Sequence, residues 1–207
     1  MLQGYLCWKD PASGQITSIY VPGDVPDLHT VTAPQLDAHL TALGPVVVAF
    51  VPHAFFHDIS SQSVNLGRAL RRLGMAETAS LRNWIVNLGS RDSLARVAHL
   101  ICEITVRLRA VGLAQNYQLP SPFTQSDLAS ACAISPVHAN RIIQDLRRRR
   151  ALQWQSRTIT ITDWRMLVHL ARFEPDYLGL RQVAGFQRPG SIPSISPAET
   201  PTFSVTP

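Results

Sequence analysis

The stretch TQSDLASACAISPVHANRIIQDLRRRRALQWQSRTITI, from Thr124 to Ile161, decides the fold of the C-terminal part of this 207-residue chain. Thr124, followed three residues later by Asp127, is the pattern of a capping box at the start of a short helix. A tight turn follows. Ser135 and Pro136 then suit the N-cap and the first position of a second helix, where no backbone N–H is needed.

The second helix of this stretch is amphipathic. Its apolar face carries Ala139, Ile142, Ile143 and Leu146 at helical spacing. Its outer face carries His138, Arg141, Gln144, Asp145 and Arg148. After Arg150 the pattern changes to the alternation of two strands, with Leu152, Trp154, Ile159 and Ile161 facing one way. Two helices followed by a hairpin predict a winged helix-turn-helix, a motif that places its second helix in the DNA major groove.

The charge of the chain agrees with an anionic partner. The net charge is +5, and the cationic residues are almost all arginine, since Lys9 is the only lysine. The arginine fork suits guanine edges and phosphates. A GC-rich genome explains an overall bias towards arginine equally well, but it does not explain the run of arginines at 147–150.

Other classes of protein receive little support from the sequence. Cys7, Cys102 and Cys132 are odd in number and widely spaced, which predicts neither a disulfide framework nor a metal pair and suits a reducing cytoplasm. No apolar run has the length of a membrane helix, and no signal peptide is visible at Met1. We find no nucleophile elbow, phosphate-binding loop or paired carboxylates, and therefore do not expect an enzyme.

The N-terminal part divides into β-structure and two helices. Residues 1–62 are predicted to be β, with a short strand ending at the turn Pro22-Gly23-Asp24 and a buried strand at Val46–Val51. A long helix is predicted over residues 64–88, ended by Gly89. Five of its apolar residues form a seam of roughly heptad spacing: Leu66, Leu70, Leu73, Trp84 and Leu88. Such a seam indicates either a dimerisation helix or a helix packed within one chain.

The helix predicted over residues 91–112 has a regular apolar stripe. The stripe is formed by Leu94, Val97, Ile101, Ile104, Leu108 and Val111. Asp92 suits the positive end of its dipole, and Glu103 with Arg107 is an i,i+4 ion pair. A linker at 116–123 and a last helix at 163–173 are also predicted. Residues 183–207, rich in proline, serine and threonine, are predicted to be a disordered tail.

The run S-P-V-H-A-N-R at Ser135–Arg141, with Thr124-Gln125 upstream, resembles the DNA-binding domain of the Crp/Fnr family of bacterial transcription regulators. The resemblance extends from residue 1 to about 182, since the Pro22-Gly23-Asp24 turn is similar to that of the sensory β-roll. It implies an α+β fold with a partial cyclic-nucleotide-binding-like β-roll at 1–62 and dimerisation and hinge helices at 63–114. The winged helix-turn-helix then covers 115–182.

The chain departs from the family at two points. Family members carry several dozen residues before the position of Gly4, so the β-roll is expected to be short at its N-terminus. Cyclic-AMP binders have a Gly-Glu pair after the turn and an Arg-Ser pair further on, whereas Val25-Pro26-Asp27-Leu28 and Asp37-Ala38-His39 stand here. Without that arginine the cyclic phosphate lacks a bidentate partner. We therefore do not expect cyclic AMP as the effector.

The resemblance also implies which residues contact DNA. Those at or near base-reading positions are Pro136, Val137, His138, Arg141 and Gln144, and Arg141 is the predicted reader of a guanine. Those placed for phosphates are Thr124, Ser126, Ser135, Arg148 and Arg157. The alternative is a solvated charged face on a structural helix-turn-helix.

Two pairs of residues have metal-like spacing. His99 and Cys102 are three apart on a predicted helix, but two ligands do not make a zinc site, and a buried helix position is the simpler interpretation. His53 and His57 are four apart near a predicted strand end, where a packing or surface role competes with a haem or metal sensor. The cysteine cluster of iron–sulfur members is missing. No cofactor is predicted.

These observations predict a cytoplasmic bacterial regulator that binds a pseudo-palindromic operator in double-stranded DNA as a homodimer. RNA polymerase is a further partner that the resemblance implies, and the effector is unknown. One alternative is a sensor or protein-interaction module that has lost sequence-specific DNA binding. Another is a sensor that holds a cyclic nucleotide in an altered pocket.

Overall fold

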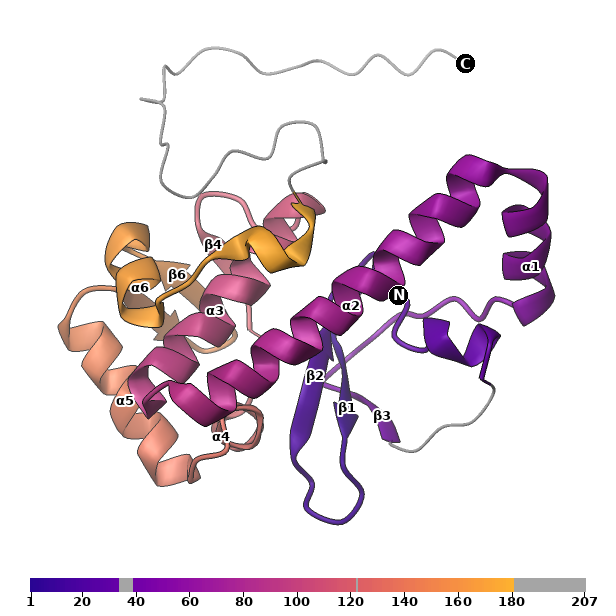
Figure 1. The fold of residues 1–207 in the computed structure, drawn as a ribbon. Coiled ribbons are helices and arrows are strands. Elements are labelled where there is room, and N and C mark those ends of the chain that lie inside the picture. The colour runs from indigo at the N-terminus through magenta and orange to yellow at the C-terminus, as the bar shows by residue number, and fades with distance from the viewer. Residues whose placement is uncertain (34–38, 122, 181–207) are drawn as a thin grey trace, which may run out of the picture.

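The computed structural model describes residues 1–33, 39–121 and 123–180. The predicted disordered tail at 183–207 lies outside them. The elements in chain order are β1 (Leu6–Lys9), β2 (Ile16–Tyr20), the 3₁₀ helix η1 (Leu28–Val31), β3 (His39–Ala42), α1 (His53–Gln62), α2 (Val64–Ser90), α3 (Ser93–Ala110), β4 (Gln118–Pro120), α4 (Gln125–Ala131), α5 (Pro136–Arg148), β5 (Leu152–Gln155), β6 (Thr158–Ile161), α6 (Trp164–Ala171) and the 3₁₀ helix η2 (Pro175–Leu178). Figure 1 shows α2 running from α1 at one end to the C-terminal helices at the other. This is the predicted α+β architecture.

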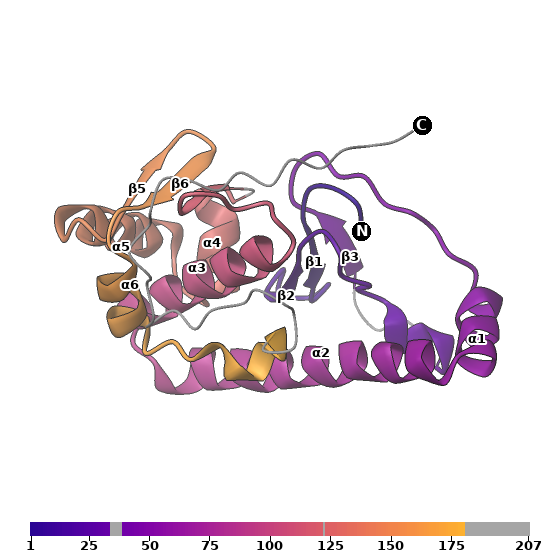
Figure 2. The same ribbon diagram turned by 90° about the horizontal axis from the view of Figure 1, so that it is seen from above.

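The N-terminal sheet is antiparallel in the order β2-β1-β3; β1 and β2 are largely buried, whereas β3 is mostly exposed. Cys7 and Ile19, which are paired in the register, belong to the main core of the molecule. Leu6, Trp8 and Tyr20 point the other way and form a second, smaller cluster. Figure 2 shows the sheet lying between α2 and the helices that precede the C-terminal hairpin. Strand β2 is therefore buried at four of its five positions, with Thr17 exposed.

Two predictions for residues 46–62 are wrong. The run Val46–Val51 forms no strand beyond a single bridge between Val47 and Gln3, and its side chains are largely exposed, with Phe50 at 94%. Residues 53–62 are helix α1 and not β-structure, so His53 and His57 lie on a helix. The physical reason is that a β-branched run needs a partner strand, and β3 pairs only with β1.

Helix α2 extends for 27 residues, about 40 Å. The Ser63 hydroxyl caps it by accepting from the Leu66 N–H. Gly89 does not end the helix as predicted; Ser90 is still helical, and the chain becomes extended at Arg91. Within the described residues, neither this helix nor any other combines the length and apolar character that crossing a membrane requires.

The predicted seam on α2 does not behave as one surface. Trp84 is buried in the core of the same chain, and Leu88 packs against that core. Leu66 and Leu73 are 50% and 46% exposed. The C-terminal half of the seam packs against the sheet and α3 of the same chain. The sequence pattern alone could not distinguish this packing from a dimer contact.

Helix α3 is the centre of the molecule, and its predicted stripe is confirmed. Val97, Ile101, Ile104 and Leu108 are all 1% exposed or less. Asp92 is the N-cap and accepts from the Ala95 N–H at 2.9 Å. Val111, predicted to continue the stripe, follows the last helical residue and is 45% exposed.

A buried polar chain joins α3 to the segment that follows α6. The Tyr177 hydroxyl donates to the Glu103 carboxylate at 2.6 Å and lies 3.2 Å from Nε2 of His99. The Tyr177 hydroxyl therefore lies within hydrogen-bond distance of both side chains and links Glu103 to His99. Burial lowers the pKa of His99 to about 3, so the folded ring is neutral. Burial and the Glu103 carboxylate raise the pKa of Tyr177.

This arrangement predicts a loss of stability in acid. The unfolded chain binds a proton on His99 below about pH 6.5, whereas the folded ring stays neutral until about pH 3. The unfolded state therefore binds more protons in that window, and the free energy of unfolding falls as pH falls, by up to about 1.4 kcal/mol per pH unit. Urea unfolding across the window measures the slope. His99→Phe keeps an aromatic ring and should give a shallower slope; equal slopes would contradict the assignment.

The three cysteines and His99 are buried. Cys7, Cys102 and Cys132 are free and buried, and burial raises their thiol pKa values, that of Cys7 to about 11 and that of Cys132 to about 12. His99 is 2% exposed, as expected of a buried helix position. Among the described residues, no three His, Cys, Asp or Glu side chains are grouped so that they could hold a metal ion.

Candidate nucleic-acid interface

Helices α4 and α5 form the predicted helix-turn-helix. The capping box is confirmed: the Asp127 N–H donates to the Thr124 hydroxyl at 3.1 Å, and the Thr124 N–H donates to the Asp127 carboxylate at 3.0 Å. Between the helices Ala133 adopts a left-handed conformation, with φ of 50°. Ser135 then caps α5 by accepting from the His138 N–H at 3.2 Å, and Pro136 occupies the first turn.

Helix α5 buries the predicted face and exposes the other. Ala139, Ile142, Ile143 and Leu146 are 7% exposed or less, because they pack against α4, α3 and the following hairpin. The hairpin is also confirmed: β5 and β6 are antiparallel, and β4 adds a third strand on the far side of β6. Helix α5 is thus held from behind along its length, and its outer face is left free.

A shallow groove of about 470 Å³ runs along the outer face of α5. It is lined by Gln125, Pro136, Val137, Asn140, Arg141, Gln144 and Arg148. Four of the five predicted base-reading residues and one predicted phosphate residue therefore share one surface. Val137 is 64% exposed, so its aliphatic side chain is accessible on this surface.

Sequence reasoning missed two members of this groove. The Asn140 amide donates to the Gln125 side chain at 3.3 Å, which ties α5 to the first turn of α4. Both have amide groups that can pair with adenine. Only the crossing of the two helices brings Gln125 to the groove. Asn140 could have been found from its spacing, since it precedes Arg141 and lies four residues before Gln144.

His138, the fifth predicted base-reading residue, does not line the groove. Its Nε2 is 2.7 Å from the Ser93 hydroxyl at the start of α3. The ring therefore contacts the helix that supports the motif, while Arg141 remains exposed on the groove side. The role of His138 in base reading stays a prediction.

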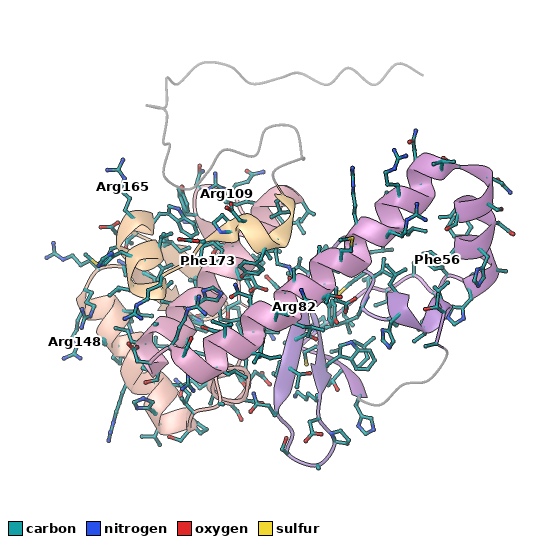
Figure 3. The ribbon with its side chains drawn as sticks, in the orientation of Figure 1. Phe56, Arg82, Arg109, Arg148, Arg165 and Phe173 are labelled. Carbon is teal, nitrogen blue, oxygen red and sulfur yellow. The ribbon has the colours of Figure 1, made fainter. Side chains whose placement is uncertain are left out.

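The predicted phosphate residues are exposed but lie in different surroundings. Thr124, Ser126 and Ser135 are at the N-terminal ends of α4 and α5. Arg148 is 77% exposed, lies at the outer edge of the molecule (Figure 3), and is 3.2 Å from Asp145. Arg149 contacts the same carboxylate at 2.9 Å, so one acidic residue offsets part of the arginine run.

Arg157 does not join the groove. It lies at the turn of the hairpin next to Ser156, whose φ is 52°. Its guanidinium approaches Gly44 and lines a cavity with Leu43 and Pro45 of the N-terminal part. In this conformation the wing arginine faces the sheet side of the molecule, and its contact with a DNA backbone stays a prediction.

The helix-turn-helix is also fixed to the N-terminal sheet. The Ser130 hydroxyl of α4 donates to the Gly14 carbonyl at 2.8 Å and accepts from the Ile16 N–H at 3.0 Å. Lys9 lies 3.7 Å from Asp127. The β1–β2 hairpin therefore sets the position of α4, and through it the groove.

Comparison with known proteins agrees with this geometry. Residues 95–170 match the family described as the Crp-like helix-turn-helix domain. The chain carries a Crp-like helix-turn-helix. The match begins inside α3, so the supporting helix belongs with the Crp-like motif and is more than a connector.

Two curated relatives show the same likeness at low identity. The anaerobic regulatory protein of Haemophilus influenzae is 25% identical over 157 residues, which are 75% of this chain and 60% of that protein. The anaerobic regulatory protein of Pasteurella multocida is 25% identical over 158 residues, 76% of this chain and 57% of that protein. The chain thus spans about 60% of the length of the curated relatives it matches.

Solved structures show the fold beyond the Crp-like motif. FixK2 from Bradyrhizobium japonicum superposes with a TM-score of 0.72 at 21% identity, covering 82% of this chain and 84% of FixK2. A CooA mutant from Carboxydothermus hydrogenoformans gives a TM-score of 0.60 at 14% identity, covering 82% of this chain and 76% of that one. The likeness is one of fold, and it extends over 82% of this chain, well beyond the matched helix-turn-helix.

Proposed function

We propose that this protein is a transcription regulator of the Crp/Fnr type, which binds double-stranded DNA through the exposed face of α5. The observation that carries the proposal is the groove in which Arg141, Gln144 and Asn140 are collected on a rigid, capped helix. Guanidinium and amide groups at this spacing offer donors and acceptors to guanine and adenine edges in the major groove. Nothing in the groove is catalytic.

The roles of individual groove residues follow from their exposure. Arg141 reads a guanine through O6 and N7, and Gln144 and Asn140 contact neighbouring bases. Val137, with its exposed aliphatic side chain, suits a thymine methyl group. Thr124, Ser126, Ser135 and Arg148 position the motif on the phosphates, and Arg157 joins them if the wing turns away from Gly44.

The proposed regulator is a bacterial, cytoplasmic homodimer that acts on RNA polymerase at a pseudo-palindromic operator. A dimer requires a face on α2 that its own chain leaves free. Met75, Ala79, Arg82 and Val86 recur at heptad spacing opposite the buried Trp84, and Met75 and Val86 are 72% and 50% exposed. This face, on which Arg82 is labelled in Figure 3, replaces the earlier seam as the proposed dimer contact.

We expect Val86→Glu to convert the dimer to a monomer, because two carboxylates would then meet across the two-fold axis. Sedimentation velocity gives the mass of each species. Ala69→Glu, also exposed on α2 but off this face, is the matched control and should stay dimeric. Leu66→Glu tests the rival seam; a monomer from that change, with Val86→Glu still dimeric, would refute the assignment.

Cyclic AMP is not proposed as the effector. The Pro22-Gly23-Asp24 turn leads into η1, with Asp27 as its N-cap, and no Gly-Glu pair stands there. A cavity of about 760 Å³ lies between the sheet, η1, α1 and α2, and Arg71 is the arginine among the described residues that lines it. Residues 37 and 38 of the second expected stretch lie outside the described residues.

The proposed function is tested by selection from a pool of random duplex DNA, followed by sequencing. Enrichment of a palindromic motif, with half-sites about one helical turn apart, is expected. Affinity for that motif should fall steeply as salt rises, because phosphate contacts release counterions. A folded dimer that enriches nothing, with or without added cyclic nucleotides, would favour an interaction module that has lost DNA binding.

A further inference from the structure

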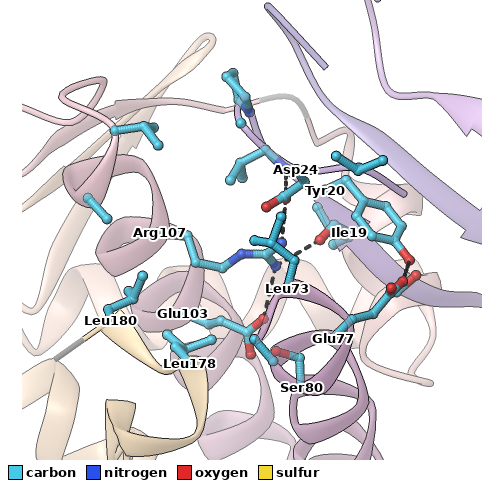
Figure 4. Close-up of a pocket in the computed structure, with 18 of the residues that line it drawn as sticks. Ile19, Tyr20, Asp24, Leu73, Glu77, Ser80, Glu103, Arg107, Leu178 and Leu180 are labelled. Carbon is cyan, nitrogen blue, oxygen red and sulfur yellow. Dashed lines mark hydrogen bonds and ion pairs between the residues drawn. The ribbon is translucent and has the colours of Figure 1, made fainter. Parts of the chain in front are cut away.

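A second cavity, of about 240 Å³, lies where four parts of the fold meet. Its walls come from β2 and the turn that follows it, the middle of α2, the C-terminal half of α3, and η2 with Leu180 (Figure 4). The apolar part of the wall includes Ile19, Val21, Leu73, Leu81, Trp84 and Leu178. The cavity is separate from the α5 groove and adjoins the larger cavity beside η1, with which it shares Ser18, Tyr20, Leu28, Glu77 and Leu81.

The charged groups of the cavity wall are already paired. Arg107 donates to the Asp24 carboxylate at 2.6 Å, to Glu103 at 3.2 Å and to the Ile19 carbonyl at 2.8 Å. Figure 4 shows this guanidinium between the turn and α3. Glu77 also lines the cavity and accepts from the Tyr20 hydroxyl, so the wall carries three carboxylates and one guanidinium. It therefore offers no free cation to an anionic ligand such as a phosphate.

Two buried polar groups of the wall, the Ser18 hydroxyl and the Trp84 indole N–H, have no hydrogen-bond partner among the described residues. The indole N–H of Trp84 is buried and makes no hydrogen bond to any described residue. Trp84 itself is 8% exposed and lines the cavity. A buried donor without an acceptor costs about 1–3 kcal/mol, which a ligand oxygen placed opposite it would recover.

We propose that this cavity binds a small neutral molecule that has one aromatic ring and one hydrogen-bond acceptor. An apolar cavity of about 150 Å³ suffices for a benzene ring, so this one holds a ring and a short polar substituent. The excess of negative charge disfavours an anion, and each carboxylate of the wall already accepts a hydrogen bond within the chain, so we assign a neutral ligand. The acceptor pairs with the Trp84 N–H.

The cavity is placed to influence the Crp-like motif. Helix α3 packs along α6, and η2 follows α6 directly, so two of the four walls belong to the C-terminal part. A third wall, α2, carries the proposed dimer face. A ligand that binds one arrangement of these walls more tightly shifts the population towards it. This effector role rests on the proposed function, whereas binding itself does not.

The probe is 4-fluoroacetophenone, a single ring with a carbonyl acceptor, added to the full chain and followed by fluorine NMR. We expect line broadening with a Kd of about 1 mM or tighter. Ala76→Phe fills the cavity from α2 and should abolish the broadening. Ala69→Phe makes the same change on an exposed part of α2 that does not line the cavity, and should leave it unchanged.

Trp84→Phe keeps an aromatic ring but removes the donor. It should weaken probe binding by about 2- to 10-fold, and it keeps the test decisive if Ala76→Phe fails to fold. No broadening by the full chain, or equal broadening in Ala76→Phe, would overturn the site. Probe binding without any change in operator affinity would overturn the effector role. Probe binding by a protein that selects no DNA would leave the site intact and refute the proposed function instead.

Discussion

Arg141→Ala is expected to lower affinity for the selected operator by about 5- to 150-fold, because one bidentate pair with guanine contributes about 1–3 kcal/mol of discrimination. The side chain is exposed in the α5 groove and its helix is capped and buried behind, so the substitution should leave the fold unchanged. Fluorescence anisotropy with labelled operator measures the affinity. Repeating the selection with the variant should give a motif that is relaxed at one position in each half-site.

Arg149→Ala is the matched control for this prediction. Arg149 is the C-cap residue of α5, the helix that carries Arg141. It contacts Asp145 and does not line the groove. Its loss should weaken binding to all sequences alike and reduce the salt dependence, without relaxing the motif. If Arg141→Ala also weakened every sequence equally, Arg141 would be a phosphate contact, and base reading would have to be assigned to Gln144 or Asn140.

Arg107→Met is expected to reduce the free energy of unfolding by about 3–5 kcal/mol, because it leaves two carboxylates without their partner. The Arg107 side chain is 15% exposed, and it joins the turn at Asp24 and the strand at Ile19 to Glu103 on α3. Methionine retains most of the volume, so the loss is electrostatic. Urea unfolding at neutral pH measures it.

Arg109→Met on the same helix provides the comparison. Arg109 is exposed, and its guanidinium lies 4.7 Å from the centre of the Tyr117 ring. Such an exposed cation–π contact contributes about 0.5–1 kcal/mol, and the variant should lose no more than that. If the two variants had equal free energies of unfolding, the ion pairs of Arg107 would make no net contribution to stability beyond that of an exposed contact.

The C-terminal part could be predicted well because its signals are local. The capping box of Thr124 and Asp127, the Ser-Pro start of α5 and the alternation of Leu152 to Ile161 each act within a few residues, and the structure confirms all three. The buried stripe of α3 was equally clear, since its period held over five turns. These features can be predicted without knowing which helices and strands contact each other in the folded protein.

Local patterns did not determine the surroundings of residues whose positions depend on distant segments of the chain. The run Val46–Val51 has strand composition, yet among the described residues it pairs only through one bridge to Gln3. The seam on α2 had a heptad pattern, but Trp84 is buried by its own chain. Gln125 joined the groove only because α4 crosses α5, and His138 left it because Ser93 lies beside its ring.

The sequence by itself determined the helix-turn-helix, its basic outer face and the resemblance to the Crp/Fnr DNA-binding domain. Helix caps, periodicity and local charge depend only on residues that are close together in the chain. The tertiary structure alone decided which face of α2 is free, which residues share the groove, and where buried charges leave a cavity. Burial removes water from a group, and whether a side chain is buried depends on segments far away in the chain. Periodicity shows that a face is apolar, but only packing shows what covers it.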